Sequence, residues 1–132
     1  MKTLVVDDEL VSRKKMHKIM ESFGESTAVE NGTDAIKAFK KSWEMGIPYD
    51  LITLDIAMPD MTGIQVLTKI REIEKEKNIP EEKLVKIMMV TSHSDKEIVI
   101  SSMKAGCNNY IVKPFDKERV LKKMETLGFK FE

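Results

Sequence analysis

Short apolar runs alternate along the chain with longer segments whose apolar residues repeat at helical spacing. The runs cover residues 4–6, 26–30, 51–54, 87–90 and 110–112, and the second of them has the weakest pattern. Short, nearly continuous apolar runs are typical of strands that are covered on both faces of a parallel sheet. We therefore predict five strands at these positions.

A helical pattern follows each predicted strand. The first helix is indicated by apolar residues at i, i+3, i+4 and i+7, namely Met16, Ile19, Met20 and Phe23. Gly24 is expected to be its C′ residue. The other four helices are indicated by Ile36, Phe39 and Trp43, by Val66, Ile70 and Ile73, by residues 96–105, and by Val120, Met124 and Leu127.

Five strand–helix units in succession predict an α/β fold with a five-stranded parallel sheet and helices on both faces. We expect one domain that covers residues 1–132. Alternation alone is compatible with a flavodoxin-like strand order, 2-1-3-4-5, and with a small Rossmann-type order. The charged segment 72–83 contains Pro80 and is expected to be a solvated helix end followed by a loop rather than a partner surface.

Composition narrows the functional classes. Apolar residues make up 42% of the chain and charged residues 33%, as in ordinary globular proteins. The 22 basic residues balance the 22 acidic ones, so net charge gives no reason to expect a nucleic acid or a membrane as partner. Cys107 is the single cysteine, which excludes an internal disulfide, and no apolar run approaches the roughly 20 residues of a membrane span. We expect a cytoplasmic protein.

Polar residues follow four of the predicted strands. Asp7 and Asp8 end the first strand, Asp55 the third, Thr91 the fourth and Lys113 the fifth. In an open α/β sheet, ligands bind outside the carboxyl ends of the strands. If these four strands are neighbours, three carboxylates, a hydroxyl and an ammonium lie on the same rim.

Carboxylates held together repel one another, and a cation relieves the repulsion. Oxygen ligands without His or Cys favour a hard ion such as Mg²⁺. A carboxylate beside Mg²⁺, with a hydroxyl and an ammonium close by, suits phosphoryl transfer to a carboxylate oxygen. Each residue alone has a simpler interpretation, as a helix cap, a turn residue or a solvated lysine. Their common position at strand ends favours the site.

Four fragments of the chain resemble the receiver domains of bacterial response regulators in two-component systems. They are the acidic-pair strand at residues 4–9, the acceptor strand and loop at 54–63, the hydroxyl segment at 90–92 and the lysine segment at 104–115. All four occur in the family's order, and the resemblance covers nearly the whole chain. Because the chain ends at Glu132, just after the last predicted helix, we expect a stand-alone receiver similar to the chemotaxis regulators.

The resemblance implies a role for each site residue. Asp55 would accept the phosphoryl group, and Mg²⁺ (or Mn²⁺) would be held by Asp8, by Asp55 and by the backbone carbonyl of Ala57, with Asp7 acting through water. Lys113 and Thr91 would bind phosphoryl oxygens. The resemblance also implies the strand order 2-1-3-4-5 and a cis peptide bond between Lys113 and Pro114.

The resemblance further implies two protein partners, a phosphoryl donor and a downstream target. A sensor histidine kinase or a histidine phosphotransfer protein would donate the phosphoryl group. Thr91 and Tyr110 would act as switch residues that alter the face formed by the fourth helix, fifth strand and fifth helix, where a downstream protein would bind. Ala57 and His93 occupy positions that influence how water reaches the phosphoryl group in this family, so the lifetime of the phosphorylated state stays open.

Two other functions are compatible with parts of the pattern. A phosphohydrolase with an aspartyl-phosphate intermediate would have an acid two residues after the nucleophile, where this chain has Ala57. A pseudo-receiver that binds partners without phosphorylation would lack Asp55, Lys113 or the acidic pair, and all are present. We therefore expect a signalling receiver that promotes only its own phosphorylation and dephosphorylation, and not an enzyme.

Overall fold

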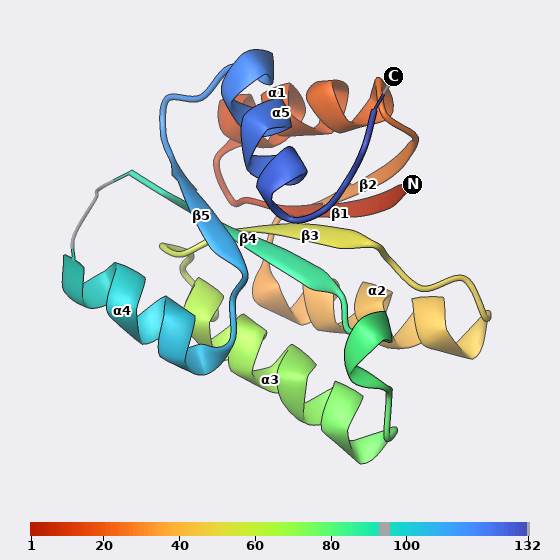
Figure 1. Cartoon of the computed structure of the whole chain (residues 1–132). Coiled ribbons are helices and arrows are strands. Elements are labelled where there is room, and N and C mark those ends of the chain that lie inside the picture. Colours follow the sequence, from red (N-terminus) through yellow and green to blue (C-terminus); the bar gives the residue numbers. More distant parts are fainter. Residues whose placement is uncertain (93–95, 132) are drawn as a thin grey trace.

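A computed structural model describes residues 1–92 and 96–131, so His93 lies outside the described residues (Figure 1). The strands are β1 (Lys2–Val6), β2 (Glu25–Val29), β3 (Leu51–Asp55), β4 (Lys86–Thr91) and β5 (Asn109–Val112). The helices are α1 (Leu10–Glu21), α2 (Gly32–Glu44), α3 (Gly63–Glu76), α4 (Lys96–Ala105) and α5 (Lys117–Thr126), with a short 3-10 helix, η1 (Glu81–Lys83).

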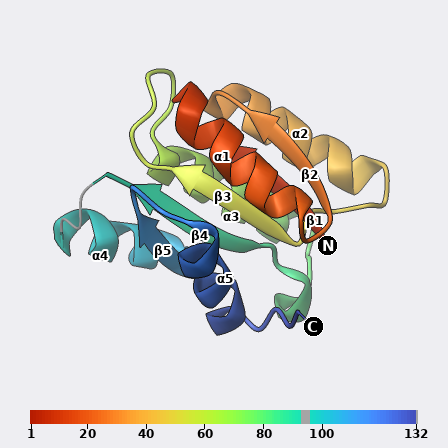
Figure 2. The same ribbon diagram turned by 90° about the horizontal axis from the view of Figure 1, so that it is seen from above.

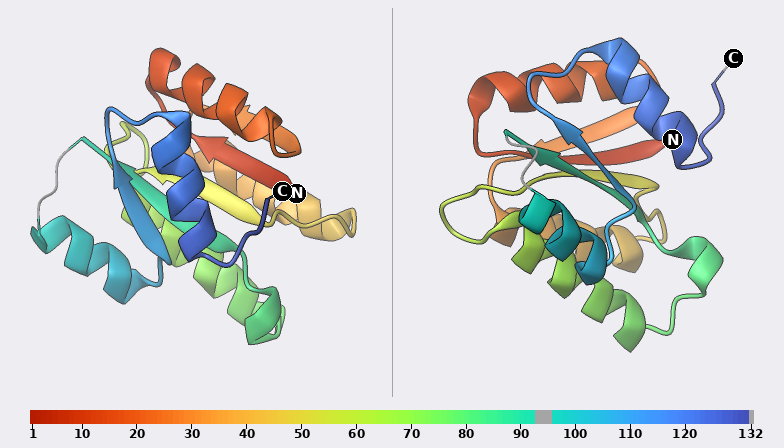
Figure 3. Two further views of the ribbon diagram at one scale, coloured as in Figure 1. Left: turned by 45° about the horizontal axis from the view of Figure 1, so that its top comes forward. Right: turned by 60° about the vertical axis from the view of Figure 1, so that its left-hand side comes forward.

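The five strands form one parallel sheet in the order β2-β1-β3-β4-β5. This confirms the order that the family resemblance implied and excludes the Rossmann-type alternative. Helices α1 and α5 cover one face of the sheet, and α2, α3 and α4 cover the other (Figures 1 and 2). The same layers are visible from the two further directions of Figure 3. No helix in the described parts of the chain is both long and apolar enough to cross a membrane.

The interior strands β1, β3 and β4 are largely apolar because both faces of the sheet are packed, whereas the edge strand β2 is more polar. Alternate residues of β4 enter different cores: Ile87 and Met89 face α2 and α3, whereas Met88 and Val90 join the core on the α1 and α5 side. A strand exposed on one face would need polar residues at every second position. The sequence pattern therefore reflects a sheet buried between two helical layers.

One local prediction was wrong. Helix α1 ends at Glu21 with Ser22 as its C-cap, so Gly24 is not the C′ residue. Gly24 has a φ of +154° and lies against the backbone of Met1, where a Cβ atom would collide with the carbonyl oxygen of Met1. The glycine is thus required by a close backbone approach at the entry to β2.

The charged segment 72–83 is a helix end followed by a mostly exposed loop, as predicted, but Glu74 is an exception. Helix α3 extends to Glu76, and η1 follows Pro80. Glu74 is only 1% exposed, although it belongs to the segment predicted to be solvated. Arg71, one helical turn earlier, donates to it over 2.7 Å, and this pairing makes the burial of the carboxylate tolerable.

Candidate functional site

The carboxyl ends of β1, β3, β4 and β5 bring the predicted site residues to one edge of the sheet. In the strand register, Val6 lies beside Leu54, Asp55 beside Val90, and Thr91 beside Val112. Asp7 and Lys113 are the residues that directly follow β1 and β5. The expectation that these strand ends converge is confirmed.

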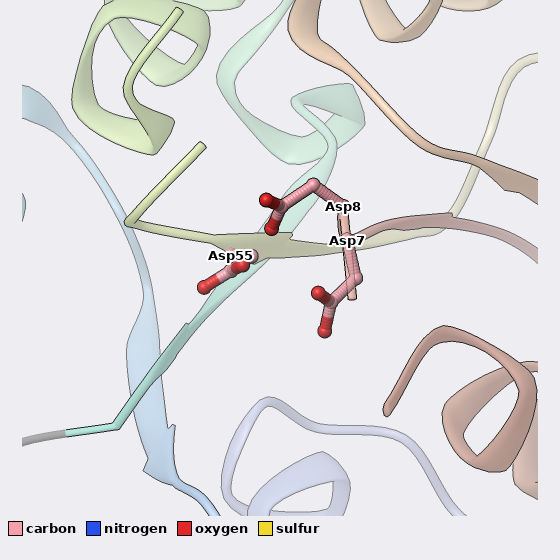
Figure 4. A group of neighbouring side chains, drawn as sticks. All are labelled: Asp7, Asp8 and Asp55. Atoms are coloured by element: carbon pink, nitrogen blue, oxygen red, sulfur yellow. The ribbon is translucent and has the colours of Figure 1, made fainter. Parts of the chain in front are cut away.

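Three carboxylates form a cluster at this edge, and Asp7, Asp8 and Asp55 are hereafter called the acid cluster (Figure 4). One carboxylate oxygen from each residue lies within 4.8 Å of the others. Asp7 and Asp55 are buried, at 4% exposure each, whereas Asp8 is exposed. The backbone N–H of Glu9 donates to Asp7 Oδ1 over 2.9 Å and fixes the start of the loop after β1.

Lys113 supplies the positive charge that contacts the acid cluster. Its Nζ lies 3.1 Å from Asp7 Oδ2 and 3.7 Å from Asp55 Oδ2, and its side chain is 12% exposed. Burial lowers the pKa of Lys113, but its hydrogen bond to Asp7 and the charges of Asp55 and Asp7 raise that pKa above its usual range. Lys113 is therefore cationic at neutral pH.

The charges of the acid cluster are not balanced. Burial, followed by the repulsion of Asp7, raises the pKa of Asp55 from 3.8 to about 7, although Lys113 lowers it. Three carboxylates face one ammonium among the described residues, and one of the three holds its proton near neutral pH. A divalent cation would relieve this repulsion, and the oxygen-only donor set fits Mg²⁺.

Thr91 and Lys113 are tied together through the backbone. Thr91, the last residue of β4, is 4% exposed, and its carbonyl accepts a hydrogen bond from the Lys113 N–H over 2.7 Å. The Lys113–Pro114 peptide bond is cis, as expected. Tyr110 is half-buried on β5, and Lys123 Nζ lies 5.0 Å from its ring centroid. Tyr110 is thus on the strand that leads to Lys113, with one face towards α5.

The loop between β3 and α3 is closed tightly over the end of β3. The Gly63 N–H donates to the Ile56 carbonyl over 2.8 Å, and a Cβ atom at Gly63 would collide with the Asp55 carbonyl oxygen. The sequence marks Gly63 only as a loop residue and does not distinguish Asp60, which reaches α2 from this loop. The only sequence signal for Asp60 is an acid near a predicted helix start, and that signal does not identify its partner.

The chain matches the family model of the response regulator receiver domain over residues 3–125. It therefore belongs to the response regulator receiver family, and its relatives place it among the receivers of the CheY type.

It is 32% identical over 126 residues to the chemotaxis protein CheY of Treponema pallidum (strain Nichols), covering 96% of this chain and 81% of that one. It is 35% identical over 127 residues to the chemotaxis protein CheY homolog of Campylobacter jejuni (serotype O:23/36, strain 81-176), covering 95% and 90%. Among solved structures, the CheX–CheY–BeF3–Mg²⁺ complex from Borrelia burgdorferi contains a chain that matches with a TM-score of 0.81 and 28% identity over 98% of this chain and 90% of that one.

Proposed function

We propose that this protein is a phosphorylation-controlled signalling switch in which Asp55 accepts a phosphoryl group. The donor is a phosphohistidine of a sensor histidine kinase or of a histidine phosphotransfer protein. The observation that carries the proposal is the acid cluster, whose three carboxylates gather at the strand ends with one ammonium beside them. An acid whose pKa is strongly raised by burial and by a neighbouring charge, as for Asp55, is a candidate functional residue.

Mg²⁺ is the cofactor of the proposed reaction. Asp8, Asp55 and the backbone carbonyl of Ala57 would hold it directly, and Asp7 through water. The ion would supply positive charge for the transferring phosphoryl oxygens and would favour the ionised form of Asp55. Ionisation matters because the pKa of Asp55 is about 7 without a metal, and only the carboxylate is a nucleophile.

The residues of the chain then have distinct tasks. A carboxylate oxygen of Asp55 forms the bond to phosphorus as the phosphorus–nitrogen bond of the donor breaks, and the imidazole leaves with that electron pair. Lys113, already 3.7 Å from Asp55, pairs with a phosphoryl oxygen, and Thr91 donates its hydroxyl to another. The reaction modifies the protein itself, so no separate substrate is turned over.

The phosphorylated state would be read on the face formed by α4, β5 and α5. Thr91 moves towards the phosphoryl group, and Tyr110 turns inward and alters this face. Helix α4 carries two exposed apolar side chains, Ile100 at 51% and Met103 at 49%, which suit contact with a protein partner. Output is therefore by direct protein contact through this face.

Intact mass spectrometry tests the phosphoacceptor. The protein is incubated with a small acyl phosphate and Mg²⁺, and borohydride reduction then marks the aspartyl phosphate for peptide mapping. We expect a Mg²⁺-dependent adduct on the natural protein, none on Asp55→Asn, and a normal adduct on Asp50→Asn, a matched change at the other end of β3. No adduct on the natural protein, or an undiminished one on Asp55→Asn, would refute the proposal.

Fluorine NMR tests the switch. The chain has two tyrosines, so 3-fluorotyrosine labelling gives two signals, and Tyr49, which is 8% exposed beside β3, serves as an internal control. Beryllium fluoride with Mg²⁺ should shift the Tyr110 signal and leave the Tyr49 signal in place. An unchanged Tyr110 signal in a protein that binds beryllium fluoride would exclude the aromatic switch.

A further inference from the structure

Asp60 connects the loop after the phosphoacceptor strand to a different helix. It lies in the segment 56–62 between β3 and α3, and its carboxylate reaches the N-terminus of α2. Oδ1 accepts from the Gly32 N–H and Oδ2 from the Thr33 N–H, each over 3.2 Å. The Thr33 hydroxyl also donates to Oδ2 over 3.2 Å. The contact joins residues that are 27 and 28 positions apart in the chain.

These bonds complete the capping of α2. The first backbone N–H groups of a helix have no partner within the helix. Asn31 Oδ1 accepts from the Asp34 N–H over 2.8 Å. The backbone N–H groups of Gly32 and Thr33 remain, and both donate to the Asp60 carboxylate. Burial raises the pKa of Asp60, but the hydrogen bonds from Gly32 and Thr33 bring it below the usual value. The carboxylate is therefore ionised, as the positive end of the helix dipole favours.

Side-chain packing strengthens the same junction. A Cβ atom at Gly32 would lie 2.8 Å from Met61 Cβ and 2.7 Å from Val66 Cγ2, so only glycine allows α2 to approach the loop this closely. The two ends of the loop are joined by the bond from the Gly63 N–H to the Ile56 carbonyl. Ala57 lies between these two attachments, and its carbonyl is the proposed metal ligand.

We infer that Asp60 is a positioning residue of the phosphoacceptor site, which holds the β3–α3 loop against α2 so that the Ala57 carbonyl is presented to the acid cluster. The inference rests on the proposed function. Asp60 is not one of the proposed metal ligands, and it would act on the site through the loop backbone. Groups that orient metal ligands commonly change metal affinity by about 10–100-fold when removed.

The test compares Asp60→Ala with Asp34→Ala in the full chain. Asp34 also lies in the first turn of α2 and lines the same surface hollow beside Asp8, so its removal deletes the same charge without releasing the loop. Mg²⁺ affinity is measured by calorimetry, and labelling by an acyl phosphate is measured as a rate. We expect Asp60→Ala to weaken Mg²⁺ binding about 10-fold and to slow labelling, and Asp34→Ala to change both less than about 2-fold.

Two graded variants separate positioning from folding. Asp60→Asn keeps an amide oxygen that can still accept from the helix, and Thr33→Val removes one of the three hydrogen bonds. We expect the Mg²⁺ affinity of both variants to fall between that of the natural protein and that of Asp60→Ala. If urea unfolding shows that Asp60→Ala is too unstable for the Mg²⁺ measurement, these two variants still test the inference. Natural Mg²⁺ affinity in folded Asp60→Ala, or in both graded variants where Asp60→Ala does not fold, overturns the inference and leaves the phosphoacceptor assignment intact. Failure of the natural protein to form an adduct refutes the proposed function itself.

Discussion

Buried carboxylates occur at both ends of the sheet, and the two groups differ in how their charges are balanced. The acid cluster lies at the carboxyl ends of the strands, where the pKa of Asp55 is raised to about 7. At the other end, beside the start of β4, Glu74 is equally buried. Among the described residues Glu74 has one cationic partner, Arg71 Nη1 at 2.7 Å, and its second oxygen accepts from the Val85 N–H over 2.8 Å.

The remaining bonds of Arg71 show what a structural ion pair looks like. Its guanidinium donates to the Val85 carbonyl over 2.9 Å, to the Gly106 carbonyl over 3.0 Å and to Asn108 Oδ1 over 3.1 Å. It thereby joins α3 to the start of β4 and to the turn between α4 and β5. Charge is matched one to one there and the hydrogen bonds are nearly complete, whereas the acid cluster keeps an excess of negative charge. Burial alone therefore does not mark a reactive carboxylate; unmatched charge does.

The largest expected effect is on stability, at the balanced pair. Glu74→Ala leaves the partly buried Arg71 guanidinium without its anionic partner and the buried Val85 N–H without its acceptor, and removing one member of a buried ion pair typically costs about 3–5 kcal/mol. Urea unfolding followed by circular dichroism measures the loss. Glu72→Ala, two residues earlier on the exposed side of α3, is the matched control and should change the free energy of unfolding by less than about 0.5 kcal/mol. Similar free energies of unfolding for the two variants would show that the Arg71–Glu74 ion pair does not stabilise the fold.

Mg²⁺ should stabilise the folded protein by binding at the acid cluster. A ligand that binds only the folded state at 100 times its Kd stabilises it by about 2.7 kcal/mol. We expect an increase of this size for the natural protein and for Glu72→Ala, reversed by a chelator. Asp55→Asn lacks a proposed ligand and should respond much less at the same Mg²⁺ concentration. An equal response of Asp55→Asn would place the ion elsewhere.

Without metal, Asp55→Asn should be more stable than the natural protein at pH 8, by about 0.5–2 kcal/mol, because it removes a repulsive charge from a functional site. The pH dependence gives a sharper test. The folded state holds the Asp55 proton up to pH 7 or so, whereas the unfolded state releases it near pH 3.8.

The stability that this proton contributes is complete below pH 3.8 and is lost as the pH rises to about 7. Metal-free natural protein should therefore lose stability relative to Asp55→Asn across this interval, and the difference should level off above it. Urea unfolding of both proteins at a series of pH values measures the curve. A constant difference from pH 4 to 8 would mean that the pKa of Asp55 is not raised.

The smallest effect is expected at an exposed ion pair. Lys122 Nζ lies 3.6 Å from Glu118 Oε1 on α5, and both side chains are more than 70% exposed. Pairs of this kind contribute about 0.3–0.5 kcal/mol and are screened by salt. Glu118→Gln should therefore change the urea midpoint only slightly, and less at high salt. A change as large as that of Glu74→Ala would show that burial does not decide how much an ion pair of this protein contributes.

The strands and the acid cluster could be predicted from the sequence because their signals are local. Continuous apolar runs mark strands packed on both faces, and each run ends at a polar residue. The strand order has no local signal in the sequence. It was predicted from the family resemblance, because the alternation of strands and helices alone allows two orders. Glu74 and Asp60 were missed because their main-chain partners, Val85 and Gly32, lie 11 and 28 positions away. A charged residue on a helix is usually solvated, and only the tertiary structure reveals such an exception.

The strand order also determines when the site is completed during protein synthesis. The chain emerges from its N-terminus, and β1, the second strand from one edge of the sheet, is made first. The acid cluster is whole once β3 has been made, but Lys113 follows β5, the last strand and one edge of the sheet. A nascent chain that ends at β4 therefore carries all three acids without Lys113, so the proposed phosphoacceptor site is complete only after β5 has docked.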